Sequence, residues 1–333
     1  MSQKDSVGVA LQADISTPST TMDYWPPVTA ENLDVTRDEM KLDEAFGVRA
    51  PSDTEMGSKS VAGKVEGAVR PTSIGAFLSA CFGEPDTTTL SAGVYQHVWD
   101  AVAAGMEPLP LSIMSVNGDV TPSIVELYEG CMLNTLDLSA ATKDYMMMAA
   151  DFLGLGIDAS QSAPSVTRDG SAKFRWDQLG ATLSVNGAQA TAIKLSEFGF
   201  TYGNGIELDD PAFGETNPSG VTAGDVEVGC TFTATENLGA HRTRALLDTP
   251  ENCRLVLTAT GAHIGVTSVH TSLAIDIARL RYTSVPVDIS GKDILKNVKV
   301  TCRGSLDETL SKLVTVTLVN GEDGSKYVAP GVS

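Results

Sequence analysis

The chain has 333 residues and carries 23 Lys and Arg against 42 Asp and Glu, a formal net charge of −19. The length predicts two domains or one large one, and a hydrophobic content of 42% excludes global disorder. The acidity is spread along the chain and excludes a general nucleic-acid binder, because phosphate binding needs clustered Lys and Arg. No segment approaches the ~20 consecutive apolar residues of a membrane span, so we expect a soluble protein without a membrane anchor.

The five cysteines are widely spaced, odd in number and contain no CxxC pair. This pattern predicts buried, reduced thiols instead of a disulfide framework or a zinc site. The apolar island Val7–Leu11 is too short for a secretory signal. We therefore expect synthesis in the cytoplasm and no export.

Residues 1–60 are rich in Thr, Ser, Pro, Asp and Glu, and the segment Tyr24-Trp25-Pro26-Pro27 forbids a helix. Two interpretations stay open, a disordered stretch or an arm that becomes ordered on a partner. The aromatic pair Tyr24 and Trp25 favours the arm, because large aromatic side chains commonly anchor interfaces.

The next segment, residues 61–156, predicts a first β domain with one packed helix. An alternating strand over 61–70 is followed by a helix over 72–82, with apolar residues at helical spacing and Gly83 as its stop. Asn117-Gly118 predicts a tight hairpin. Residues 123–138 read as a strand pair or one bent strand, with a possible bulge at Gly130.

The last segment, residues 157–333, predicts a second β domain after a Gly/Ser/Pro-rich connection at 155–172. A second hairpin is predicted at Asn186-Gly187. Residues 225–235 alternate between a polar face and an apolar face. A short helix over 237–248 follows, with Asn237 as its cap and Leu246 among its inward residues.

The order of elements repeats, since strand, helix and several strands occur in both halves. Both strands that precede a helix also contain Val-Glu after a Gly. We therefore suspect that one fold is used twice in the chain.

Residues with recognisable catalytic spacing are missing from the sequence. The four histidines show no HxxxH or HExxH spacing, and no GxSxG, P-loop or dinucleotide fingerprint occurs. Asp209-Asp210 lies in a Pro-Gly loop without calcium-loop spacing. We expect no enzyme, no metal and no cofactor.

In order and spacing, the chain resembles the tail tube (major tail) proteins of long, non-contractile-tailed bacteriophages. The resemblance covers nearly the whole chain and rests on the helix that ends at Phe82-Gly83 and on these segments: Val9–Pro18, Val65–Pro71, Leu109–Ser112, Tyr128–Asn134, Phe198–Gly205 and Val314–Asn320. It implies a mainly β fold, a sandwich or barrel with packed short α-helices. It also implies a virion protein whose subunits stack as rings around a DNA channel, beside a tape measure protein and other tail proteins. Rings of this family are hexameric, or trimeric with pseudo-sixfold symmetry when each chain carries two tube folds.

On this resemblance, we expect a channel that conducts DNA without binding it specifically, because an acidic lining repels phosphates. Candidate lumen-lining residues are Asp225, Glu227, Thr231 and Thr233, although simple exposure on the outside would give the same pattern. Candidate contacts between rings are Tyr24, Trp25, Asp209 and Asp210.

Three other functions stay open from the sequence. A tail terminator or a capsid-decoration protein would share this composition. A carbohydrate-binding β-sandwich would need an exposed aromatic platform, and the three tryptophans lie in different segments.

Overall fold

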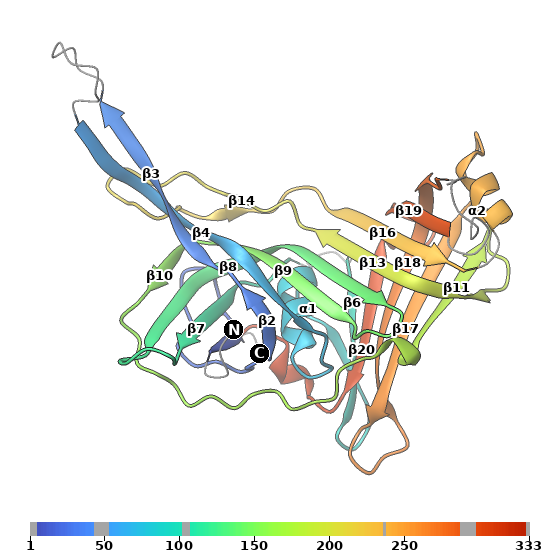
Figure 1. Ribbon diagram of the computed structural model, residues 1–333, viewed down its shortest axis with the longest axis horizontal. Coiled ribbons are helices and arrows are strands. Elements are labelled where there is room, and N and C mark those ends of the chain that lie inside the picture. The colour runs from blue at the N-terminus through green and yellow to red at the C-terminus, as the bar shows by residue number, and fades with distance from the viewer. Residues whose placement is uncertain (1–4, 43–52, 102–106, 236–237, 287–297, 331–333) are drawn as a thin grey trace.

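A computed structural model describes residues 5–42, 53–101, 107–235, 238–286 and 298–330, and its main elements are antiparallel strands (Figure 1). The first half contains β1 (Ser6–Leu11), β2 (Val28–Glu31), β3 (Asp34–Leu42), β4 (Asp53–Ala68), α1 (Ile74–Phe82), β5 (Asp86–Ser91), β6 (Val94–Asp100), β7 (Leu111–Asn117), β8 (Ile124–Ala141), β9 (Met147–Gly154) and β10 (Gly156–Asp158). The second half contains β11 (Leu179–Val185), β12 (Thr191–Ile193), β13 (Leu195–Gly203), β14 (Glu207–Leu208), β15 (Val221–Thr222), β16 (Glu227–Ala234), α2 (Leu238–Ala245), β17 (Cys253–His263), β18 (His270–Ser284), β19 (Val298–Gly304) and β20 (Val314–Asn320). Two short 3₁₀ turns lie at Trp176–Gln178 and Gly324–Lys326.

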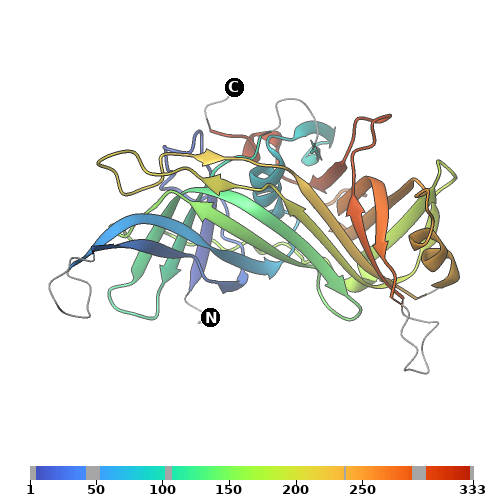
Figure 2. The ribbon, with the colours of Figure 1, turned by 90° about the horizontal axis from the view of Figure 1, so that it is seen from above.

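Eight strands pair side by side in one long antiparallel sheet, in the order β3-β4-β9-β8-β13-β16-β19-β18. The sheet extends from the β3–β4 hairpin at one end of the molecule to the neighbourhood of α2 at the other, and both views show this separation (Figures 1 and 2). The mainly β fold, of sandwich type, is therefore confirmed.

The two halves pair their strands in the same pattern. In the first half β1 pairs with β7, β7 with β8, β8 with β9 and β10, β9 with β4, and β4 with β3. In the second half β11 pairs with β17, β17 with β18, β18 with β19 and β20, β19 with β16, and β16 with β13. Each half also places its helix directly after β4 or β16.

Irregularities in the ladders recur at matching places. The β8–β9 register shifts between Leu133 and Thr135, and the β18–β19 register shifts between Tyr282 and Ser284. A shift between Val28 and Ala30 in the β2–β4 pair likewise matches one between Leu195 and Glu197 in the β13–β16 pair. Position by position, β2 and β3 together therefore correspond to β13.

The buried core lies under one face of the long sheet, where α1 packs against β8, β1 and β6. Every residue of α1 is buried, and the helix ends at Gly83, whose φ of 95° suits a glycine cap. The helix predicted over 72–82 is confirmed in place and in its stop signal. Residues 124–141 form one long strand, with Gly130 at φ 57° within the bulge opposite β7.

Three local predictions are wrong or fall outside the described residues. Asn117-Gly118 is not a tight turn, because Asn117 pairs with Ile124 and its side chain accepts from the Asp119 N–H at 3.1 Å, which leaves a loop over 118–123. Leu246 is not inward but 65% exposed, since α2 ends at Ala245. The predicted cap Asn237 lies outside the described residues.

Residues 1–60 are not a structureless stretch in their described parts. β1 is buried along its length, and β3 pairs with β4 in a hairpin that projects beyond the body of the molecule (Figure 1). None of the described helices combines the length and the apolar character that crossing a bilayer requires.

Candidate functional site

One face of the long sheet is polar from β4 to β19. The register aligns its side chains in rows, such as Glu66–Ala149–Asp137–Thr201–Gly229–Arg303 and Lys64–Asp151–Thr135–Gly203–Glu227. Because side chains alternate along a strand, the residues between them point to the buried core. We call this surface, made by alternate residues of β4, β9, β8, β13, β16 and β19, the polar face.

Direct polar contacts link neighbouring strands across the polar face. The Thr201 hydroxyl donates to Asp137 at 2.5 Å, and the Thr233 hydroxyl donates to Glu197 at 3.1 Å. Lys64 lies 3.5 Å from Asp151, and Arg303 pairs with Glu227. These exposed pairs contribute little stability individually, so their main effect is to fix side-chain positions on the surface.

The balance of charge on the polar face is acidic. Its described ionisable residues are the acids Glu66, Asp137, Asp151, Glu197 and Glu227 and the bases Lys64, Lys299 and Arg303. Small residues such as Gly199 and Thr231 separate them. The surface can therefore lie along a polyanion without offering a cluster of cations for tight phosphate binding.

The predicted lumen-lining residues all lie at the polar face or its rim. Asp225 precedes β16 and is exposed, Glu227 opens β16 and is exposed, and Thr231 is half-buried. Thr233 is 9% exposed, and its hydroxyl donates to Glu197. The predicted alternation of this strand is confirmed, since Val228, Cys230 and Phe232 are buried on the other side. Sequence reasoning missed the contributions of β4, β8, β9 and β13, because only the long-range pairing brings them together.

The aromatic pair expected to contact a neighbouring ring is instead buried within the chain. Tyr24 is 7% exposed and stacks on Tyr327 with ring centroids 6.0 Å apart. Trp25 is 5% exposed and packs with Met114, Val116 and other residues of β7 and β8. Neither ring has surface to offer a partner, so we do not carry these two residues forward as contacts between rings.

Asp209 and Asp210 are exposed in the loop that joins β13 to β16, which contains the small β14–β15 pair. The Thr222 hydroxyl donates to Asp209 at 3.0 Å, and the Ser219 hydroxyl donates to the Asp210 carbonyl at 2.7 Å. The loop lies beside the β3–β4 hairpin, where the Lys59 N–H donates to the Thr216 carbonyl at 2.8 Å. Phe213, in the same loop, is fully exposed.

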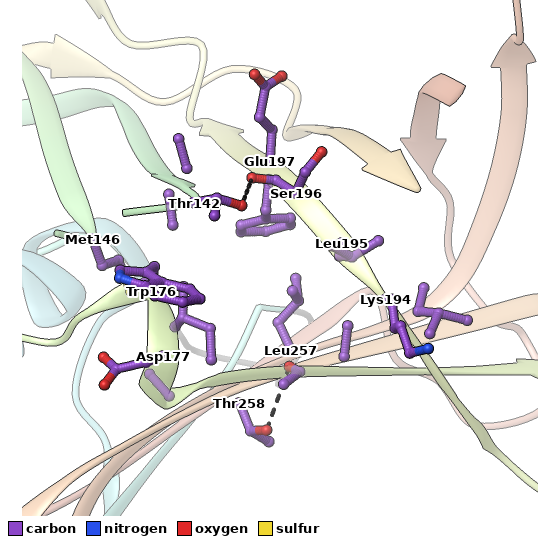
Figure 3. Close-up of a pocket in the computed structure, with 18 of the residues that line it drawn as sticks. Thr142, Met146, Trp176, Asp177, Lys194, Leu195, Ser196, Glu197, Leu257 and Thr258 are labelled. Carbon is purple, nitrogen blue, oxygen red and sulfur yellow. Dashed lines mark hydrogen bonds between the residues drawn. The ribbon is translucent and has the colours of Figure 1, made fainter. Parts of the chain in front are cut away.

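An apolar pocket of about 480 Å³ opens between β8, β13, β11 and β17 (Figure 3). Alanine and leucine side chains line it, and Trp176, 46% exposed, stands among the lining residues. The Thr142 hydroxyl bonds the Ser196 carbonyl at 2.9 Å and ties β8 to β13 at the rim. The Ser196 hydroxyl, also in the lining, donates to the Thr233 carbonyl at 3.4 Å.

His97, His241 and the five cysteines occupy buried positions. His97 is buried and contacts Thr87, Asn320 and the Glu322 carbonyl, and burial lowers its pKa. The cysteines are buried and free, and burial raises the pKa of the Cys131 thiol. Within the described ranges, no three His, Cys, Asp or Glu residues gather as metal ligands would.

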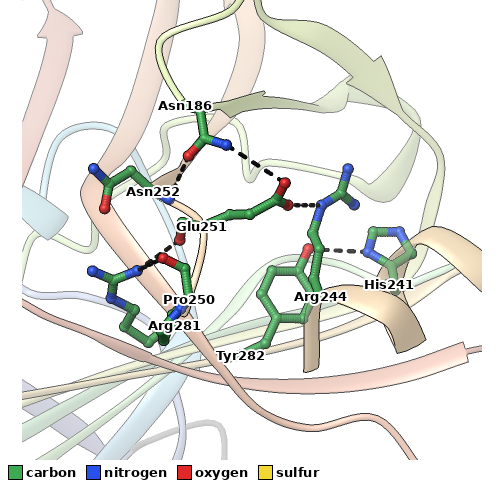
Figure 4. Close-up of polar contacts among 8 residues, drawn as sticks. All are labelled: Asn186, His241, Arg244, Pro250, Glu251, Asn252, Arg281 and Tyr282. Atoms are coloured by element: carbon green, nitrogen blue, oxygen red, sulfur yellow. Dashed lines mark hydrogen bonds and ion pairs between the residues drawn. The ribbon is translucent and has the colours of Figure 1, made fainter. Parts of the chain in front are cut away.

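A polar cluster fixes α2 against the sheet (Figure 4). His241 Nδ1 lies 3.0 Å from the Tyr282 hydroxyl of β18, and Arg244 pairs with Glu251 at 3.1 Å. Arg281 donates to the carbonyls of Pro250 and Glu251, both at 2.8 Å. These contacts hold α2, the start of β17 and the far part of β18 as one unit.

Comparison with protein-family models decides the class of this β-rich chain. A model described as phage tail tube protein matches residues 2–294. The chain belongs to the phage tail tube protein family. Comparison with curated proteins gave no match.

Membership in this family assigns the chain a structural role in the phage tail tube and a place in the virion. Family membership suggests a structural protein and not an enzyme. It also implies self-assembly into a tube with other tail proteins.

Proposed function

We propose that the chain polymerises as stacked rings and that the polar face lines the channel through which DNA passes. The observation that carries this proposal is the continuity of the polar face across both halves of the chain, on a sheet whose other face is buried. A ring of such sheets would present a hydrated inner wall and would pair the strand edges that a single copy leaves open.

The acidic balance of the polar face supports passage without binding. Each cation that neutralises a phosphate releases counterions and adds affinity, and many such contacts along a tube would hold the duplex. Five acids against three bases would instead keep DNA away from the wall. Asp225, Glu227, Thr231 and Thr233 belong to this proposed lining.

We also propose that the chain contains two copies of one tube fold, β1–β10 and β11–β20, joined by residues 159–178. The shared pairing pattern and the shared register shifts support this division. Residues 1–60 then belong to the first copy. Six folds in a ring would come from three chains, which favours a trimer with pseudo-sixfold symmetry over a hexamer.

Contacts between stacked rings are proposed for the loop at 207–222. The exposure of Asp209, Asp210 and Phe213 supports this assignment, as does the contact of the loop with the projecting β3–β4 hairpin. Inside the tube we propose a tape measure protein as the partner before DNA enters.

The test is retention of DNA by assembled tubes. Glu227→Lys and Asp137→Lys, both on the polar face, are compared with Glu308→Lys, which makes the same charge change on a loop outside that face. Tubes of the polar-face variants should retain a labelled short duplex, with release as salt rises. Equal retention by the control variant and the polar-face variants would contradict the proposed lining.

A further inference from the structure

The junction between the two halves shows how one fold copy joins the next. Residues 135–141 of β8 pair with residues 197–203 of β13. Beside this pairing, the ring of Tyr202 packs on Phe82 at the end of α1, with centroids 4.4 Å apart. Asn204 donates to the Cys81 carbonyl at 3.1 Å. The junction thus consists of a strand pairing and a covered helix end.

β13, the strand that pairs with β8 at this junction, has a counterpart at the start of the sheet whose outer edge is unpaired. β2 and β3 correspond to β13, and in the described residues they pair with β4 alone. Where β13 receives β8, no described strand pairs with the outer edge of residues 30–36, although the Tyr128 hydroxyl of β8 donates to the Leu33 carbonyl at 2.9 Å. Ala30, Asn32, Asp34 and Thr36 are exposed there.

Backbone donors on this open edge are held by the chain's own carboxylates. The Asn32 N–H donates to the Lys64 carbonyl on the β4 side, so by alternation the Leu33 and Val35 N–H groups point to the open side. Leu33 N–H donates to Glu31 and Val35 N–H donates to Asp34, both at 2.7 Å. Acidic side chains at an edge hinder uncontrolled pairing but can give way to a matching strand.

The other side of the junction, formed by β8 and the end of α1, has an uncovered counterpart at the far end of the long sheet. β18 corresponds to β8, and its pairing with β17 ends at Leu280, so residues beyond it have an open edge in the described part. Counting from the first residue of each helix, Leu246 takes the place of Phe82 and is 65% exposed. Arg242 of α2 donates to the Val285 carbonyl at 2.6 Å and holds the helix beside this strand end.

We infer that the β18–α2 end of one copy joins the β2–β3 edge of a second copy, repeating the internal β8–β13 junction. This inference rests on the proposed ring and names the surfaces that close it. Thr135 and Ser284 each follow the shared register shift, and Gly203 corresponds to Thr36. The internal pair Gly203–Thr135 therefore maps to Thr36 of one copy beside Ser284 of the next.

The helix contact maps in the same way. Tyr202 corresponds to Val35, so Leu246 of one copy packs on Val35 of the next, as Phe82 packs on Tyr202 within the chain. The two surfaces lie on the first and last strands of the long sheet, and the β3–β4 hairpin and α2 are well separated in both views (Figures 1 and 2). A contact between unlike surfaces is head-to-tail, and it closes a ring when its rotation closes.

Cysteine cross-linking of the full chain tests this register. The five native cysteines are buried, so the double variant Thr36→Cys/Ser284→Cys places two exposed thiols on a chain without competing surface thiols. Opposed residues of antiparallel strands lie within disulfide reach. Mild oxidation after assembly should give covalent dimers and trimers on non-reducing gels. Gly203→Cys/Thr135→Cys, at the internal junction, is the positive control for reactivity.

Thr88→Cys/Ser284→Cys tests the rival acceptor, β5, which is exposed along its length and pairs only with β6 in the described residues. Rings or tubes that cross-link through Thr88 but not through Thr36 would overturn the inferred pairing and leave the proposed function standing. Copies that form neither rings nor tubes and no cross-link would overturn both.

A second variant tests the helix contact without depending on thiol geometry. Leu246→Asp should raise the concentration at half assembly about tenfold or more, because it removes the burial of a leucine side chain. Its isolated chain should keep the wild-type melting temperature, since Leu246 is exposed there. Leu310→Asp, which replaces a leucine that is 49% exposed outside this surface, is the matched control. Equal assembly of Leu246→Asp and wild type would overturn the contact.

Discussion

Tyr327 ties the end of the second half to the helix of the first, and Tyr327→Phe tests how much that tie stabilises the chain. The side chain is fully buried, and its hydroxyl donates to the Thr72 carbonyl at 2.7 Å and accepts from Asn320 Nδ2 at 2.8 Å. The Ser79 hydroxyl of α1 donates to the Tyr327 carbonyl at 2.8 Å.

Removing the Tyr327 hydroxyl leaves a buried Asn320 N–H and the Thr72 carbonyl without this partner while hardly changing the packed volume. A buried polar group that loses its partner costs about 1–3 kcal/mol, so we expect Tyr327→Phe to lower the free energy of unfolding by about that amount. In urea, the unfolding midpoint should fall by roughly 0.5 M or more at an unchanged slope.

Tyr145→Phe is the control, because Tyr145 is 43% exposed and its hydroxyl loss should cost less than about 0.5 kcal/mol. Both variants are measured at a concentration at which light scattering shows single chains. Equal midpoints for the two variants would refute the reasoning that Tyr327 joins the halves through its hydroxyl.

Three further predictions follow from buried groups and from one strained glycine. Burial, with the nearby charge of Arg244, lowers the pKa of His241 to about 4 from an ordinary value of 6.5, so the unfolded chain binds more protons between these values. The contribution of neutral His241 to stability should be complete above pH 6.5 and should decline as the pH falls toward 4. His241→Gln should therefore flatten the pH dependence of the urea midpoint in that window. An unchanged slope would contradict this assignment to His241. Gly63 has φ 155°, and a Cβ there would lie 2.5 Å from the backbone of Leu33. Gly63→Ala should therefore lower the free energy of unfolding by about 2 kcal/mol or more, measured in thermal melts. Gly239→Ala, on α2 with open space around it, is the control and should be neutral or stabilising. Trp25→Ala should lower the stability of single chains by about 3–5 kcal/mol; a loss of assembly with unchanged single-chain stability would mean that Trp25 contacts a neighbour after all.

Features that depend on neighbours in the sequence could be predicted. The helix ending before Gly83 follows from apolar spacing and a glycine stop, and both are local. The turn at Asn186 and Gly187 has positive φ at both residues, 52° and 74°, as the residue types predict. The two faces of β16 follow from alternation alone.

Features that depend on long-range pairing could not be predicted. The β3–β4 hairpin extends away from the core, so even its Met40 and Met56 are exposed and its sequence shows no apolar alternation. Tyr24 was expected at an interface because nothing in the sequence shows that Tyr327, some 300 residues away, supplies its partner.

The suspected duplication likewise has a part that the sequence indicates and a part that only the strand pairing shows. Element order indicated the repeated pairing pattern on which the proposed duplication rests, but the Val-Glu pairs that suggested it do not correspond. In the observed register Val65 matches Phe232, not Val226. A duplicated fold preserves its pairing geometry and bulges more strictly than its side chains, and pairing geometry cannot be read from one sequence.

Electron cryo-microscopy of tubes assembled from the purified chain tests the central claim most directly. We expect stacked rings of six fold copies from three chains, with Asp137, Thr201 and Glu227 facing the channel. We also expect β2–β3 of each chain beside β18 of its neighbour. A channel wall formed by any other surface, or a chain that stays as single particles at high concentration, would contradict the account.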